Sequence, residues 1–120
     1  MLEKIIKVPI YNVKIKIVIC ENFEEYCKKN DISEEKLDYR AVVFDFTKFD
    51  RDFHYIVLFQ PKVNINTIVH EVFHLTVGVM NYVGNILSDS SEESFAYLNE
   101  YLFKIIYNIV IIKNARNTTK

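Results

Sequence analysis

The segment 64–83 constrains the fold more than any other part of the chain, because its apolar side chains recur at helical spacing. The repeat predicts a helix of roughly 30 Å with a broad apolar face. Asn64 or Asn66 suits the N-cap, and Gly84 suits the position just past the C-terminus. The face consists of Ile65, Ile68, Val69, Val72, Thr76, Val79, Met80 and Val83. The uncharged residues along its middle favour a helix packed under a sheet, with one edge in water.

The same helix carries the pattern His-Glu-x-x-His at His70, Glu71 and His74, beside the apolar face. Residues i and i+4 lie one above the other on a helix, so the two imidazoles can bind one metal ion together. Glu71 lies about 100° further round, where it can flank the metal and take a proton from a metal-bound water. The alternative is a surface helix with two ordinary polar histidines, which does not explain their place beside an apolar face.

A catalytic zinc site usually has three protein ligands and an open position for water. Glu93 follows His74 by 19 residues and opens the next predicted helix, so we expect it to be the third ligand. Because antiparallel helices hold these two residues at different heights, this requires crossed helices or an end of the first helix near Asn81. Asp89 and Glu92 also have the spacing of a helix cap. The competitors of Glu93 are Asp89, Glu92, Glu100 and His54.

These residues resemble the gluzincin family of zinc metallopeptidases, in which HExxH is followed by a glutamate on the next helix. The downstream sequence Glu93-Ser94-Phe95-Ala96-Tyr97-Leu98 looks like the Glu-x-x-Ala of the small bacterial and phage-type members, including peptidases that act on repressors. The resemblance covers about residues 66–102. It implies an α+β fold with a minimal zincin core: a small, mainly antiparallel three-stranded sheet packed against the HExxH helix and a long C-terminal helix.

By that resemblance the chain is a zinc-dependent peptidase with a peptide or protein substrate. Zn²⁺ would be bound by His70, His74 and Glu93, and a metal-activated water would attack the peptide bond with Glu71 as general base. Tyr97, one turn beyond Glu93, is a candidate to hydrogen-bond the tetrahedral intermediate, and plain packing is its other interpretation.

Three segments predict strands. Residues 8–20 alternate apolar and polar side chains, as in a strand with one face toward a core. Residues 40–46 and 53–60 are rich in Val, Ile, Phe and Tyr, and the polar stretch between them indicates a hairpin. We expect an edge strand, residues 53–60, to hold an extended substrate by adding it to the sheet.

Residues 22–30 and 33–38 predict one or two short helices, and a final helix is expected over 90–113 with Asp89 as its N-cap. The core face of that final helix consists of Phe95, Leu98, Leu102, Ile105, Ile109 and Ile112. Gly78 either leaves room near the metal or permits close helix packing.

A chain of 120 residues forms one domain, expected over residues 1–113, with 114–120 as a frayed polar tail. The net charge of −1 argues against a nucleic-acid partner. Cys20 and Cys27 form no CxxC pair and suit a reduced, cytoplasmic protein. We find no signal peptide and no apolar run long enough to span a bilayer, so no membrane partner is expected.

Two other functions stay open. A zinc-stabilised binding module without catalysis would use the metal for folding energy, and its apolar final helix would serve a partner or a homodimer. A metal-free α+β interaction protein or inhibitor would contain no zinc. Zinc content and peptide cleavage together separate the three.

Overall fold

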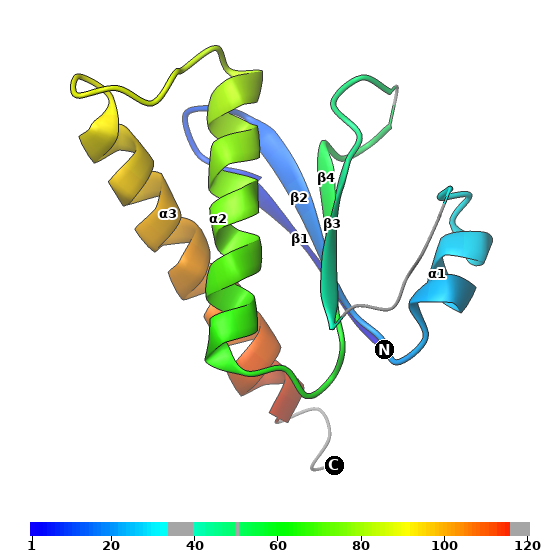
Figure 1. Cartoon of the computed structure of the whole chain (residues 1–120). Coiled ribbons are helices and arrows are strands. Elements are labelled where there is room, and N and C mark those ends of the chain that lie inside the picture. Colours follow the sequence, from blue (N-terminus) through cyan, green and yellow to red (C-terminus); the bar gives the residue numbers. More distant parts are fainter. Residues whose placement is uncertain (34–39, 50, 116–120) are drawn as a thin grey trace.

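The computed structural model describes residues 1–33, 40–49 and 51–115, which form an α+β fold. The strands are β1 (Leu2–Val8), β2 (Val13–Ile19), β3 (Ala41–Asp45) and β4 (Tyr55–Phe59). The helices are α1 (Phe23–Lys29), α2 (Ile65–Tyr82) and α3 (Glu92–Tyr107), and α3 continues as a π-helical turn, η1 (Asn108–Lys113). Figure 1 shows the sheet between two layers, with α2 and α3 on one face and α1 on the other.

The sheet has four strands in the order β1-β2-β4-β3, rather than the three that the sequence predicts. β1 pairs with β2, and β3 with β4, in antiparallel fashion, whereas β2 and β4 run parallel, so the sheet is mixed. β1 escapes prediction because it is an edge strand in which only Val8 is buried, and its sequence lacks the alternation of a half-buried strand. The predicted strand over residues 8–20 is therefore two elements, since residues 9–12 are the turn that joins β1 to β2.

The predicted hairpin is confirmed by β3 and β4, which pair from Ala41↔Phe59 to Asp45↔Tyr55. All five residues of β4 are buried, because the strand lies between β2 and β3 and is covered on both faces. The expectation that residues 53–60 form the edge that holds a substrate is therefore wrong. The free edges of the sheet belong to β1 and β3.

Each face of the sheet has its own core. Alternate residues of β2 pack with α2 and α3 in the larger core, and Val18 of the same strand points to the smaller core around α1. This division follows from the two-residue repeat of a strand. The β2 residues in the larger core are Val13, Ile15, Ile17 and Ile19.

The ends of α2 confirm the signals in the sequence. Asn64 is the N-cap, and its Oδ1 accepts a hydrogen bond of 2.9 Å from the Thr67 N–H. Gly84 has a φ of 81° just past the C-terminus. The N–H of Gly84 donates to the Asn81 carbonyl at 3.1 Å, and the N–H of Asn85 donates to the Met80 carbonyl at 2.8 Å. This pair of bonds is a Schellman motif, which a residue with a positive φ makes possible.

The start of α3 differs from the prediction. The helix begins at Glu92 after Ser91, and Asp89 is not its N-cap, so the predicted capping box is wrong. Ser91 makes no side-chain cap either, because its hydroxyl donates to the Ile86 carbonyl. Hydrogen bonds in the π turn span five residues rather than four, which rotates the later side chains. Val110 is therefore buried and Ile112 is exposed, in contrast to the predicted core face.

The helical stretch Glu92–Lys113 is, within the described ranges, the one that is long and apolar enough to cross a membrane by composition. That is weak evidence, because core helices pass the same test, and this one contributes Leu102 and Ile106 to the larger core. Asn114, from the predicted tail, is buried and donates to the Pro61 carbonyl at 2.8 Å. Residues 116–120 of that tail and most of the predicted helix over 33–38 lie outside the described residues.

Candidate metal centre

His70, Glu71 and His74 lie together on α2, and we refer to these three residues as the histidine cluster. The Nε2 atoms of His70 and His74 are 3.1 Å apart, and the two ring centroids are 4.7 Å apart. Two nitrogens bound to one tetrahedral zinc, each at about 2.0–2.1 Å, lie about 3.3 Å from one another. The two imidazoles therefore converge at close to the spacing that a shared ion needs. Both rings belong to exposed residues, so an ion can reach them from solvent.

Glu71 completes the cluster from the buried side of the helix. Its Oε1 lies 4.0 Å from Nε2 of His70, and one ligand atom from each of the three residues lies within 4.8 Å of the others. Only 7% of the residue is exposed, and Oε2 has no hydrogen-bond partner among the described residues. Burial raises the pKa of the Glu71 carboxyl above its ordinary value, and the nearby imidazoles oppose that rise. A buried carboxyl oxygen without a partner is costly, and such groups concentrate at functional sites.

A hollow of about 400 Å³ opens beside His70 and Glu71. It lies between the first turn of α2 and the start of β3, which meet at the same end of the molecule (Figure 1). Its remaining lining residues are Arg40, Ala41, Asn64, Asn66 and Thr67. Sequence reasoning did not find this hollow, because Arg40 and α2 come together only through the tertiary packing of β3 against the helix.

The structure does not bring Glu93 to the histidine cluster. Thr76 Oγ1 of α2 lies 2.9 Å from Asn99 Oδ1 of α3, which fixes the register of the two antiparallel helices (Figure 1). In that register Glu93 is level with Tyr82, eight residues or about 12 Å above His74. Glu93 also lies six residues before Asn99, so its side chain points about 120° away from the direction that faces α2.

The cause of this separation is the length of α2. The helix does end near Asn81, at Tyr82, as one of the two predicted conditions requires. The last two turns of α2 nevertheless extend well past His74 before the loop that leads to α3. α3 can therefore begin only beyond the level of the histidine cluster.

The other predicted site residues also lie outside the cluster. Tyr97 is 65% exposed and two residues before Asn99, which turns it about 200° from the side of α3 that faces α2. His54 accepts a hydrogen bond of 3.0 Å at Nδ1 from the Lys14 N–H, and its ring packs against Tyr82, so its structural interpretation is supported. The three acidic competitors, all exposed, are Asp89, Glu92 and Glu100. Among the described residues, only the three of the histidine cluster are grouped closely enough to hold a metal.

Gly78 permits close packing rather than leaving space at the metal. A Cβ at this position would lie 2.9 Å from the Tyr55 hydroxyl oxygen and 3.1 Å from two ring carbons of the same side chain. Tyr55 is buried in β4, so the glycine lets α2 approach the sheet across this ring.

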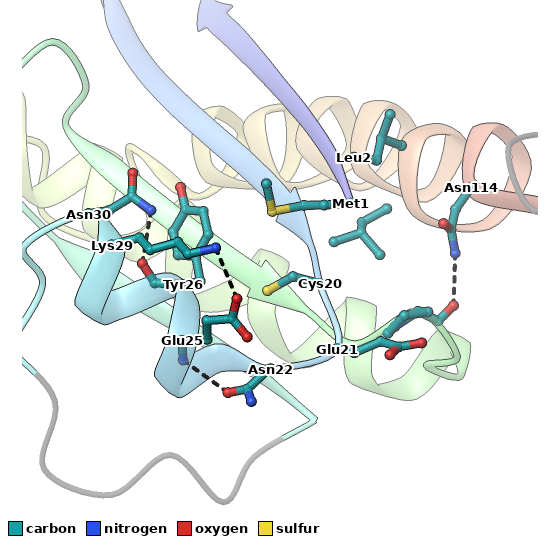
Figure 2. A pocket seen from close by; sticks show the side chains of 12 residues that line it. Met1, Leu2, Cys20, Glu21, Asn22, Glu25, Tyr26, Lys29, Asn30 and Asn114 are labelled. Atoms are coloured by element: carbon teal, nitrogen blue, oxygen red, sulfur yellow. Dashed lines mark hydrogen bonds and ion pairs between the residues drawn. The ribbon is translucent and has the colours of Figure 1, made fainter.

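A larger pocket of about 510 Å³ lies beside α1 and shares no residue with the histidine cluster (Figure 2). Its polar side chains are largely bonded to their neighbours. Lys29 pairs with Glu25 at 2.9 Å, and Asn30 donates to the Tyr26 carbonyl at 2.8 Å. Burial raises the pKa of the Cys20 thiol in this pocket to about 11, which keeps it protonated and a poor nucleophile at neutral pH. The pocket therefore shows no group prepared for chemistry.

Comparison with known proteins finds no family model that matches the chain and no similar curated protein or solved structure. The metal centre is thus supported by the spacing of three residues and by their geometry on α2.

Proposed function

We propose that the protein is a zinc-dependent peptidase in which His70 and His74 bind Zn²⁺ through their Nε2 atoms. The observation that carries this proposal is the convergence of those atoms to 3.1 Å beside a buried, partly unpartnered carboxyl. Imidazole nitrogens are preferred zinc ligands, and the donor set fits that metal. When bound, zinc would polarise the carbonyl of a peptide bond and make water acidic near neutral pH.

The proposed role of Glu71 is proton transfer. Its carboxylate accepts a proton from the attacking water while a C–O bond forms at the peptide carbonyl. The same carboxyl then donates that proton to the nitrogen of the breaking C–N bond, which leaves as an amine. Burial raises the pKa of this carboxyl above its ordinary value, which is the direction that favours a group that both gains and loses a proton. Oε1 lies 4.0 Å from Nε2 of His70, so it is the carboxyl oxygen that we assign to this transfer.

The third ligand expected from the sequence, Glu93, lies outside the histidine cluster. As the helices lie, Glu93 would reach the ion only if α3 moved by about two turns along α2. The two imidazoles alone leave the other positions of a four-coordinate zinc to water and substrate. This arrangement favours a second candidate function, a zinc-stabilised binding module of the same fold without catalysis.

β3 replaces β4 as the strand proposed to hold the substrate. It is a free edge of the sheet, and Ala41 at its start lines the hollow beside the histidine cluster. An extended peptide added to this edge by main-chain hydrogen bonds would run past His70 and Glu71.

The test compares wild type with Glu71→Gln and His74→Ala after each is loaded with zinc and freed of excess metal. We expect wild type and Glu71→Gln to retain one equivalent, and His74→Ala to lose it. Wild type alone should cleave peptides in a mixed peptide digest, read by mass spectrometry. Cleavage by Glu71→Gln at the wild-type rate would remove the assigned base. Full zinc occupancy and a chelator-sensitive melting temperature without any cleavage would instead establish the binding module.

A further inference from the structure

Among the described residues that line the hollow beside the histidine cluster, Arg40 is the one arginine or lysine. Its backbone is held at the head of β3, where its carbonyl accepts a hydrogen bond of 3.0 Å from the Gln60 N–H. The residue is exposed, and within the described part of the chain its guanidinium makes no ion pair. The fold's other described arginine is different: Arg51 donates to the carbonyls of Asn30 and Asp31 and stacks over Phe46.

Among the described residues that line the hollow, Glu71 is the only counter-charge to Arg40. Asn64 and Thr67 are neutral and bond to each other across the helix cap, and Asn66 is neutral as well. The first turn of α2 contains no acidic residue, so the positive end of this 18-residue helix is not neutralised locally. Glu71 also lines the hollow, but only 7% of the residue is exposed, and its Oε2 is buried without a hydrogen-bond partner among the described residues. The hollow is lined by both an exposed arginine and the Glu71 carboxyl, and its volume has room for a polar ligand.

We infer that Arg40 is a specificity-determining residue whose guanidinium binds a carboxylate of the peptide lying against the histidine cluster. This inference rests on the proposed peptidase function and names its substrate class: peptides with a carboxylate close to the bond that is cut. The planar guanidinium presents two parallel N–H groups that match the two oxygens of a carboxylate, so Arg40 binds it in bidentate fashion. The carboxylate comes either from the C-terminus of the peptide or from an Asp or Glu side chain.

The position of Arg40 explains why this contact would select substrates. Ala41 follows it directly on the edge strand, so a peptide added to β3 passes the guanidinium and the histidine cluster within the same hollow. A neutral peptide would leave the guanidinium in water at little cost, because the residue is exposed. The contact therefore changes the preference among substrates without being required for hydrolysis.

The experiment uses the zinc-loaded full chain and two readouts. In the first, wild type, Arg40→Gln and Arg40→Lys digest the same peptide mixture, and the cleavage sites are mapped by mass spectrometry. We expect wild-type sites to be enriched in a carboxylate within a few residues, and Arg40→Gln to lose the enrichment while still cutting neutral sites. Arg40→Lys should retain part of the enrichment, since lysine keeps the positive charge but lacks the two parallel N–H groups of the guanidinium. The matched control is Lys48→Gln, which removes an exposed cation from the loop after β3 and should leave the preference unchanged.

The second readout is binding without cleavage. A synthetic peptide with one Asp and a free C-terminus, labelled at its N-terminus with fluorescein, is titrated into Glu71→Gln with and without Arg40→Gln, and anisotropy is recorded. We expect Arg40→Gln to weaken binding by about two- to fivefold, the range for an ion pair at an exposed site. Two further synthetic peptides carry a C-terminal amide or Asn in place of Asp. The peptide whose affinity for Glu71→Gln falls by the same factor as Arg40→Gln causes identifies the carboxylate that is bound.

The two proposals fail in different ways. Cleavage by wild type with no carboxylate preference, and with Arg40→Gln indistinguishable from it, would overturn the inference and leave the peptidase intact. Arg40-dependent binding of carboxylate peptides without any cleavage would overturn the peptidase and leave the carboxylate site intact. An unchanged anisotropy titration for Arg40→Gln would refute the site whichever way the cleavage assay reads.

Discussion

Removal of the Glu93 carboxylate tests whether Glu93 is a zinc ligand, as the family resemblance implies, or lies away from the histidine cluster, as the packing of α2 and α3 requires. The resemblance makes Glu93 a zinc ligand, whereas the register of α2 and α3 holds it about 12 Å along the helix axis from His74. The variant Glu93→Ala changes only this group, which is exposed in the first turn of α3. Its effect on zinc affinity can be worked out for both cases.

If the helices lie as described, Glu93 acts on the ion only through space. A single negative charge and a divalent cation about 12 Å apart in water attract by about 0.7 kcal/mol. Physiological salt, with a Debye length of about 8 Å, reduces this to about 0.15 kcal/mol. Zinc affinity should then fall by a factor of about 1.3. Loss of a residue that hydrogen-bonds to a zinc ligand lowers zinc affinity about 10–100-fold, and loss of a ligand itself lowers it further.

The assay is competition for zinc between the protein and a chromophoric chelator at physiological salt. Glu92→Ala is the matched control, because it removes the same charge one residue away. His74→Ala supplies the value for a lost ligand. We expect Glu93→Ala and Glu92→Ala to match wild type within twofold. A loss greater than tenfold that is confined to Glu93→Ala would refute the register and place α3 two turns further along α2.

Two further predictions concern the face of α2 that meets the sheet. Burial raises the pKa of Glu71 above about 4.5, so in the metal-free protein the folded state holds this proton more tightly than the unfolded state does. The free energy of unfolding therefore falls as pH rises from about 4.5 through the raised pKa of the folded state. Glu71→Gln should raise the melting temperature at pH 8 but not at pH 4. An equal gain in melting temperature at both pH values would contradict the raised pKa. Gly78→Ala gains about 1 kcal/mol of helix propensity, but its Cβ overlaps Tyr55, and overpacking costs about 1–3 kcal/mol. Urea unfolding should show a loss that shrinks in the Tyr55→Phe background, and an unchanged loss there would mean that the hydroxyl is not the obstacle.

The parts of the fold that follow from short-range spacing can be read from the sequence. The cap at Asn64, the positive φ at Gly84 and the pairing of β3 with β4 each depend on residues within a few positions of one another. The two histidines of the cluster belong to this group, because one helical turn is enough to bring their rings together.

The parts that the sequence does not predict depend on distant neighbours. β1 is recognisable only once β2 offers it a partner, and the parallel pairing of β2 with β4 joins segments separated by α1 and β3. The predicted cap at Asp89 is displaced because Ser91 bonds to Ile86 and delays the helix. The place of Glu93 depends on the length of α2 and on the contact between Thr76 and Asn99, neither of which is contained in the HExxH spacing.

The contact at Gly78 links the packing of α2 to the environment of Glu71 in the histidine cluster. Gly78 and Glu71 are seven residues apart, so they differ by only about 20° around the helix and face the same side of the molecule. The distance between Gly78 and the Tyr55 ring therefore sets how closely this side of α2 approaches the sheet, and with it how deeply Glu71 is buried. A side chain at position 78 would lift the helix and expose the carboxyl to water, which would lower its pKa toward the ordinary value. Gly78→Ala should consequently shift the acid limb of any pH profile of hydrolysis to lower pH, whereas a purely local packing defect would reduce stability and leave that limb in place.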